Sequence, residues 1–179
     1  MEESEYMEEV KEHKNKYSLY QKIRHFLYTK IVKLMAGSIG DEIRVNNFTR
    51  ITKNTHIGNY SNFNGMCVQG NGNVKIGDYF HSGKDVLIIT DNHNYEGTEI
   101  PYDSTDIVKD VVIDDFVWIG TKVIILGGVH ISEGAIIQAG AVVVNDIPAC
   151  AIAGGNPARV FKYRNKEHFY ELKAQKRYH

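Results

Sequence analysis

The sequence predicts an all-β solenoid, a parallel β-helix of about six coils with one helix before it and one after it. An aliphatic residue returns at every sixth position, and a second small or branched apolar residue follows each of them after four places. The first series is Ile113, Ile119, Ile125, Ile131, Ile137 and Val143; the second is Val117, Val123, Val129, Ala135, Ala141 and Ile147. A helical period would spread six-residue spacing around the whole cylinder, and simple strand alternation would not need the intervening glycines, Gly120, Gly127, Gly128, Gly134 and Gly140.

Size and composition fit a single domain without a nucleic-acid partner. The chain has 179 residues and a formal net charge of −1, so it lacks the basic field of a nucleic-acid binder. The acidic first residues form neither a signal peptide nor a spanning helix, which predicts a cytoplasmic protein. Cys67 and Cys150 fall at small apolar positions of the repeat, and we expect both to be buried free thiols, with Cys67 on the inward ladder.

Residues 1–37 are expected to form an N-terminal helical segment. Residues 1–15 are polar, and an amphipathic helix is predicted over 17–35, ended by Gly37. Its apolar residues are Leu19, Ile23, Phe26, Leu27, Ile31, Leu34 and Met35. We expect this stripe to cover the first coil, because a solenoid needs a cap. Weak association with a membrane surface is the alternative, favoured by Lys22, Arg24, Lys30 and Lys33.

Residues 38–162 are expected to form the β-helix. The early repeats are Ile39, Val45, Ile51, Ile57 and Phe63, and a one-residue insertion at 70–73 shifts the phase to Ile76, Ser82 and Ile88. Residues 90–110 do not fit the repeat and should project as a loop, where function is often carried. Residues 163–179 should close the chain with a helix from about Asn165, with Phe169 and Leu172 facing inward.

His93 is the first candidate for chemistry. It lies at the base of the predicted loop among Asp91, Asn92 and Asn94. An imidazole exchanges protons readily near neutral pH and can act as a general base. A surface histidine hydrated by water is the alternative from composition alone.

Four segments carry a resemblance to a known family. They are Trp118-Ile119-Gly120-Thr121 within 116–121, the segment 138–141, the segment 146–148, and the segment 154–160. In this order they resemble the hexapeptide-repeat acetyltransferases, closest to the maltose, galactoside and nodulation-factor branch and the polysaccharide O-acetyltransferases. The resemblance spans about 39–162. It implies a left-handed β-helix, a homotrimer with active sites between subunits, and acetyl-CoA as co-substrate, with no metal.

The resemblance also implies roles for single residues. His93 would be the general base that takes the proton of a sugar or glycan hydroxyl during direct acetyl transfer in a ternary complex. The residues implied in acceptor binding are Asn64, Trp118, Asp91 and Tyr95. Those implied in binding acetyl-CoA are Trp118, Gly120, Thr121, Ala139, Val144, Asn145, Arg159, Lys162 and Arg164. Relatives often have a threonine-lysine pair where this chain has Val144-Asn145, which removes one cationic contact.

Three other functions stay open. An amino sugar or small amine could replace the hydroxyl acceptor. A metal hydratase like the γ-type carbonic anhydrases would need three imidazoles. The candidates are His56, His93 and His130, which share the sixth place of their repeats. His93 and His130 would lie on successive coils if the loop only interrupts the repeat without changing its phase. Stacked hexads also serve as scaffolds without catalysis.

Overall fold

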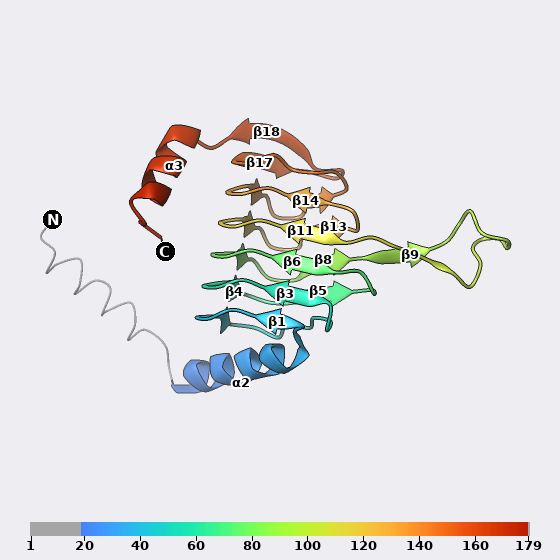
Figure 1. The fold of residues 1–179 in the computed structure, drawn as a ribbon, viewed down its shortest axis with the longest axis horizontal. Helices are drawn as coiled ribbons and strands as arrows, with labels where there is room; N and C mark the ends of the chain where they lie inside the picture. The colour runs from blue at the N-terminus through green and yellow to red at the C-terminus, as the bar shows by residue number, and fades with distance from the viewer. Residues whose placement is uncertain (1–18, 179) are drawn as a thin grey trace, which may run out of the picture.

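The computed structural model describes residues 19–178, and the polar stretch predicted over 1–15 lies outside them. The chain forms a parallel β-solenoid of stacked triangular coils, as predicted (Figure 1). Helix α2, Leu19–Met35, lies across one end of the stack, and a hairpin leaves the side. Strands β17, Ala151–Gly154, and β18, Arg159–Tyr163, lie at the other end. The left-handed sense of the coil stays a prediction.

Three faces build the prism, and each is a sheet that runs along the solenoid. Face A consists of β1 Ser38–Ile39, β3 Thr55–Ile57, β6 Val74–Ile76, β11 Val111–Ile113 and β14 His130–Ile131. Face B consists of β2 Arg44–Val45, β4 Asn62–Phe63, β7 His81–Ser82, β12 Trp118–Ile119, β15 Ile136–Ile137, β17 Ala151–Gly154 and β18 Arg159–Tyr163. Face C consists of β5 Met66–Gln69, β8 Val86–Ile89, β13 Ile124–Leu126 and β16 Val142–Val143. The stack therefore has about six coils.

The sixth-position residues stack in register inside the prism. On face A, Ile57 pairs with Ile76, Ile76 with Ile113 and Ile113 with Ile131, and all four are buried. Burying each such side chain contributes about 1.5–3 kcal/mol. This ladder is the physical reason for the six-residue repeat, because an inward residue must recur once per face.

The phase of the repeat differs from the prediction between Phe63 and Ile76. Val68, not Gln69, stacks on Ile88, so one residue is missing before it and two are added after it. Gly65, with φ +116°, makes the shortened corner. Cys67 consequently points outward and is half-buried, so its predicted place on the inward ladder is wrong.

An aromatic ladder marks the corner between faces A and B. Tyr60, Tyr79 and Phe116 all have φ near +55°, and their rings stack with centroids 4.8 and 5.0 Å apart. Left-handed backbone at non-glycine residues is costly. Equivalent corner positions adopt it in successive coils, and the ring stacking offsets part of that cost.

Helix α2 caps the first coil with a face other than the predicted one. Val32 is buried, and Tyr28 and Met35 pack against the core, whereas Leu19, Ile23, Phe26, Leu27, Ile31 and Leu34 are exposed. The predicted apolar stripe therefore faces away from the solenoid except at Met35. Among residues 19–178, no helix has the length and hydropathy needed to span a membrane.

The C-terminal helix α3, Lys166–Ala174, confirms the predicted helix. Asn165 caps it by accepting a hydrogen bond from the His168 amide at 3.0 Å, and Phe169 is buried. The ammonium of Lys173 contacts the Glu133 carboxylate, and this hydrogen bond raises the pKa of Lys173. Before the helix, β18 turns back antiparallel on β17, a strand that the repeat pattern did not predict.

Candidate functional site

The predicted projecting loop is a β-hairpin. Strand β9, Asp91–His93, pairs antiparallel with β10, Asp106–Val108, so that His93 lies opposite Asp106. Figure 1 shows the hairpin extending away from the prism. At its base the Thr90 hydroxyl donates to the Gln69 carbonyl at 2.9 Å and accepts from the Gly72 amide at 3.1 Å, which fixes the hairpin to the wall.

Asp103 holds the tip of the hairpin together. Its carboxylate accepts hydrogen bonds from the Thr105 hydroxyl at 2.5 Å, the Thr105 amide at 2.9 Å and the Thr98 amide at 3.0 Å. These bonds, the Thr105 hydroxyl first, lower the pKa of Asp103. The tip therefore has a defined shape although it projects into solvent.

His93 is oriented by two neighbours within the hairpin. Its Nδ1 lies 3.2 Å from Oδ1 of Asp106, and its ring stacks on Tyr102 with centroids 4.0 Å apart and planes 12° apart. The side chain of His93 is 61% exposed. When Nδ1–H donates to the carboxylate, the lone pair of Nε2 is left for a substrate proton. Sequence reasoning missed Asp106 and Tyr102, because only the hairpin register places them beside His93.

Two residues near His93 were predicted to bind the acceptor. Asp91 uses Oδ2 to accept from the Asn71 amide at 3.0 Å and from the Asn71 side chain at 3.1 Å, so it ties the corner of the coil. Tyr95 lies at the hairpin tip and is 67% exposed. Tyr95 therefore has a free surface, while one oxygen of Asp91 is occupied.

Asn64 lies at the corner between faces B and C. Its side-chain amide donates to the Ser82 carbonyl at 2.7 Å, and its oxygen accepts from Asn46 at 2.8 Å. The left-handed residue of this corner is Gly65, and Asn64 itself is not left-handed. The nitrogen and the oxygen of the Asn64 side-chain amide therefore both form hydrogen bonds with neighbouring coils.

The same corner continues through Gly120, Thr121 and Ala139. A Cβ on Gly120 would lie 2.5 Å from the Ala139 amide nitrogen, so the two coils approach closely at this point. Thr121 Oγ1 accepts from the Lys84 amide at 3.3 Å, and Ala139 is exposed. Thr121 and Ala139 therefore both face solvent at this corner.

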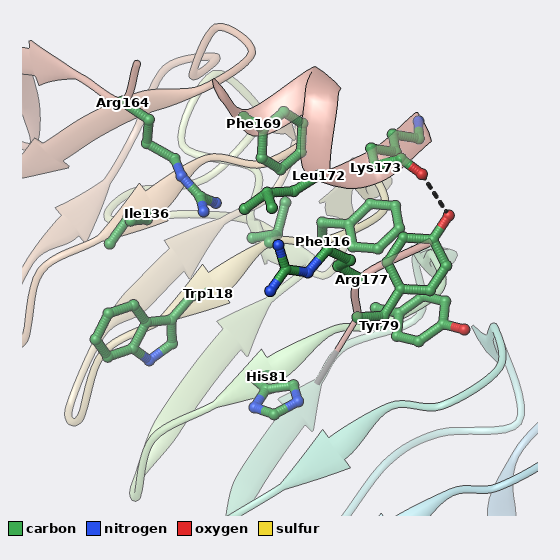
Figure 2. A pocket seen from close by; sticks show the side chains of 12 residues that line it. Tyr79, His81, Phe116, Trp118, Ile136, Arg164, Phe169, Leu172, Lys173 and Arg177 are labelled. Atoms are coloured by element: carbon green, nitrogen blue, oxygen red, sulfur yellow. Dashed lines mark hydrogen bonds between the residues drawn. The ribbon is translucent and has the colours of Figure 1, made fainter. Parts of the chain in front are cut away.

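Trp118 lies on the outer side of face B and is 56% exposed. It borders a cavity of about 410 Å³ between face B and α3, whose further lining includes His81, Ile136, Phe169 and Arg177 (Figure 2). Arg177 points into this cavity (Figure 2). Arg164 also borders it but donates to the Gly134 carbonyl at 3.2 Å and covers the Phe169 ring at 4.7 Å. Arg164 therefore anchors α3, in addition to any contact with a ligand.

The remaining predicted residues lie elsewhere. Val144 and Asn145 follow β16, at the corner between faces C and A, and both are exposed. Arg159 and Lys162 lie on β18 and are exposed, and Arg159 donates to the Ala158 carbonyl at 3.0 Å.

Trp118, Arg159 and Lys162 thus belong to face B, and most of the other predicted site residues fall at the two edges of face C. Asn64, Gly120, Thr121 and Ala139 occupy its edge with face B, while the hairpin of His93 leaves from its edge with face A, beyond Ile89. The outer side of face C between them is largely apolar, with exposed Arg50 and Gln69 beside Cys67. Its apolar residues, all half-buried, are Cys67, Leu87, Ile89, Ile124, Leu126 and Val142. Within a single chain, His93 and Trp118 therefore do not lie in one site.

The three histidines considered for a metal are dispersed. His56 and His130 lie on face A with β6 and β11 between their strands, and His93 lies in the hairpin instead of on the coil before His130. His130 contacts Asp114, with Nε2 2.9 Å from Oδ2. Within the described part of the chain, no group of three or more metal-binding side chains is present.

Sequence comparisons identify acetyltransferases. No protein-family model matches the chain. The galactoside O-acetyltransferase of Lactococcus lactis subsp. lactis (strain IL1403) is 33% identical over 119 residues, which is 65% of this chain and 56% of the relative. The 2,3,4,5-tetrahydropyridine-2,6-dicarboxylate N-acetyltransferase of Staphylococcus aureus (strain JH9) is 50% identical over 52 residues, 29% of this chain and 22% of the relative. This chain therefore matches only 56% of the length of the first relative and 22% of the length of the second.

Comparisons with solved structures also find acetyltransferases. A hexapeptide-repeat acetyltransferase of Vibrio cholerae O1 biovar eltor, solved with acetyl coenzyme A, aligns with a TM-score of 0.66 and 27% identity over 75% of each chain. A maltose O-acetyltransferase of Clostridium difficile 630 aligns with a TM-score of 0.64 and 26% identity, covering 90% of this chain and 86% of that one.

Proposed function

Because the chain belongs to the hexapeptide-repeat acetyltransferase family, we propose that it transfers an acetyl group from acetyl-CoA to a hydroxyl of a sugar or glycan. The observation that carries this proposal is the His93–Asp106 pair, exposed on the hairpin with Nε2 on the far side of the ring from the atom that contacts the carboxylate. The relatives named for galactoside and maltose support a sugar hydroxyl as the acceptor.

The site is completed by a second copy of the chain. Three copies that turn face C toward a common axis would bury its apolar outer side, including Leu87, Ile124 and Leu126. The edge that bears the hairpin of one copy then meets the edge of the next copy that bears Thr121. This arrangement brings together the two groups of residues that a single chain separates.

His93 acts as the general base in this arrangement. Nε2 accepts the proton of the acceptor hydroxyl as its oxygen attacks the thioester carbonyl. The carbon–sulfur bond then breaks, and the imidazolium gives its proton to the departing sulfur, so that coenzyme A leaves as the thiol and His93 is neutral again. Asp106 holds Nδ1–H and stabilises the imidazolium that forms, and Tyr102 restricts rotation of the ring. No covalent acyl-enzyme is required, and Cys150 is buried with a pKa raised by that burial.

The corner between faces B and C fits an extended thioester arm. Gly120 and Ala139 stack too closely for a side chain at Gly120, and Ala139 and Gly140 at this corner are exposed. Thr121 supplies a hydroxyl beside it, and the exposed cations Arg159 and Lys162 on β18 would attract phosphates. Val144 and Asn145 of the neighbouring copy would border the arm from the other edge.

Thiol release tests the proposal. Acetyl-CoA is offered with a panel of free sugars, sugar nucleotides and oligosaccharides, and free coenzyme A is measured. Replacing His93→Ala should lower turnover by about 10²–10⁴-fold with little change in acetyl-CoA affinity. His130→Ala is the matched control, because His130 forms a similar exposed pair with Asp114 on the prism wall. Unchanged turnover of the His93 variant would contradict the assignment of His93 as the general base.

An amino group is the second candidate acceptor. The N-acetyltransferase of Staphylococcus aureus is 50% identical over its matched segment, although that segment covers 22% of it. The same panel decides between the two acceptors. Turnover confined to amino sugars would replace the O-acetyl proposal by N-acetylation.

A further inference from the structure

We propose that the solvent-facing side of α2 binds an anionic lipid surface. This side of the helix, which we call the outer face of α2, consists of Leu19, Tyr20, Ile23, Phe26, Leu27, Lys30 and Leu34. The opposite side, with Tyr28, Val32 and Met35, already caps the solenoid. The helix therefore has two apolar sides, of which only one is used by the fold.

The exposure of the outer face is large for a folded domain. Leu34 is 87% exposed and Leu19 74%, and the other apolar members are all more than half exposed. Their spacing of three and four residues places them along one side of the helix. Contiguous apolar surface of this kind marks a contact with a protein or a membrane.

The charge of α2 favours an anionic lipid surface as the occupant. Lys30 on the outer face of α2 and the exposed Lys22 and Lys33 beside it lie in a helix that contains no acidic residue, in a chain whose net charge is −1. Basic amphipathic helices lie at lipid headgroups through this combination of apolar area and positive charge.

The position of Lys30 disfavours a second copy of the chain as the occupant. Lys30 lies within the apolar stripe, with its ammonium 4.7 Å from the centre of the Phe26 ring. Between two such helices this charge would be buried opposite other cations. At a lipid surface its stem can lie along the apolar side while the ammonium reaches a phosphate.

Co-sedimentation of the full chain with vesicles tests the proposal. Vesicles of phosphatidylcholine alone are compared with vesicles containing phosphatidylglycerol, at low and high salt. We expect binding only to the anionic vesicles, weakened by salt. Changing Lys22→Gln, Lys30→Gln and Lys33→Gln together should weaken it about a hundredfold, at about fivefold for each cation. Changing Ile23→Ser and Leu27→Ser should also abolish most binding.

The matched control changes three exposed lysines outside α2. Lys75→Gln, Lys166→Gln and Lys176→Gln alter the net charge equally and should leave vesicle binding unchanged. Because the altered α2 side chains are exposed, all variants should keep the wild-type unfolding temperature. Measuring this temperature checks that each variant is folded.

Four results would overturn the proposal. Three concern vesicles: absence of binding to anionic vesicles, equal binding to neutral vesicles, and equal loss in the control variant. The fourth is a lipid-free assembly that dissociates when Ile23→Ser and Leu27→Ser are introduced, which would assign the outer face to a second copy. Vesicle binding requires no turnover, so this proposal and the proposed acetyl transfer fail independently.

Discussion

Asp106→Asn tests whether the hairpin positions its histidine for catalysis. In the wild type, Nδ1 of His93 lies 3.2 Å from Oδ1 of Asp106, with the two side chains 61% and 45% exposed. A hydrogen bond to a charged partner is worth about 1.5–3 kcal/mol, and solvent exposure reduces this toward about 1–2 kcal/mol. Since each 1.36 kcal/mol is a factor of ten in rate, turnover should fall about 5- to 30-fold.

The assay is thiol release at saturating acetyl-CoA. Asp114→Asn, which removes the partner of His130 on face A, should leave turnover unchanged. A wild-type rate for Asp106→Asn would refute the reasoning. A loss equal to that of Asp114→Asn would refute it too.

Three further predictions concern the scaffold. Gly120→Ala should lower stability by about 1–3 kcal/mol in urea unfolding, because its Cβ would meet the Ala139 amide at 2.5 Å; unchanged stability would show that the coils can separate. Leu126→Asp should convert the proposed trimer to monomers in analytical ultracentrifugation and abolish turnover, and an unaltered mass would remove face C from the interface. The hydrogen bond to Glu133 raises the pKa of Lys173. The stabilisation of α3 by this bond should therefore be complete below the ordinary lysine pKa of about 10.4, and it should be lost as pH rises through the higher pKa of the folded state. Urea unfolding at alkaline pH should show this loss for the wild type and not for Glu133→Gln.

Much of the site could be predicted only through residues that carry a recognisable pattern. His93 stands where the repeat fails, and Trp118 and Gly120 stand in a motif, so each was predicted as a candidate. Asp106 and Tyr102 were not, because their role depends on the strand register that places Asp106 opposite His93. Asn64 was predicted to bind the acceptor, yet its amide is engaged by Ser82 and Asn46, which only the stacking of coils reveals.

The sequence by itself determined the solenoid, its number of coils and the place where the hairpin leaves it. The reason is local: an inward aliphatic residue must recur once per face, and a segment without that spacing cannot enter the wall. Tertiary structure decided the outward turn of Cys67, the side of α2 that caps the core, and the separation of His93 from Thr121 across face C. These features depend on which surfaces meet after the coils have stacked, and residue spacing along one strand carries no information about that.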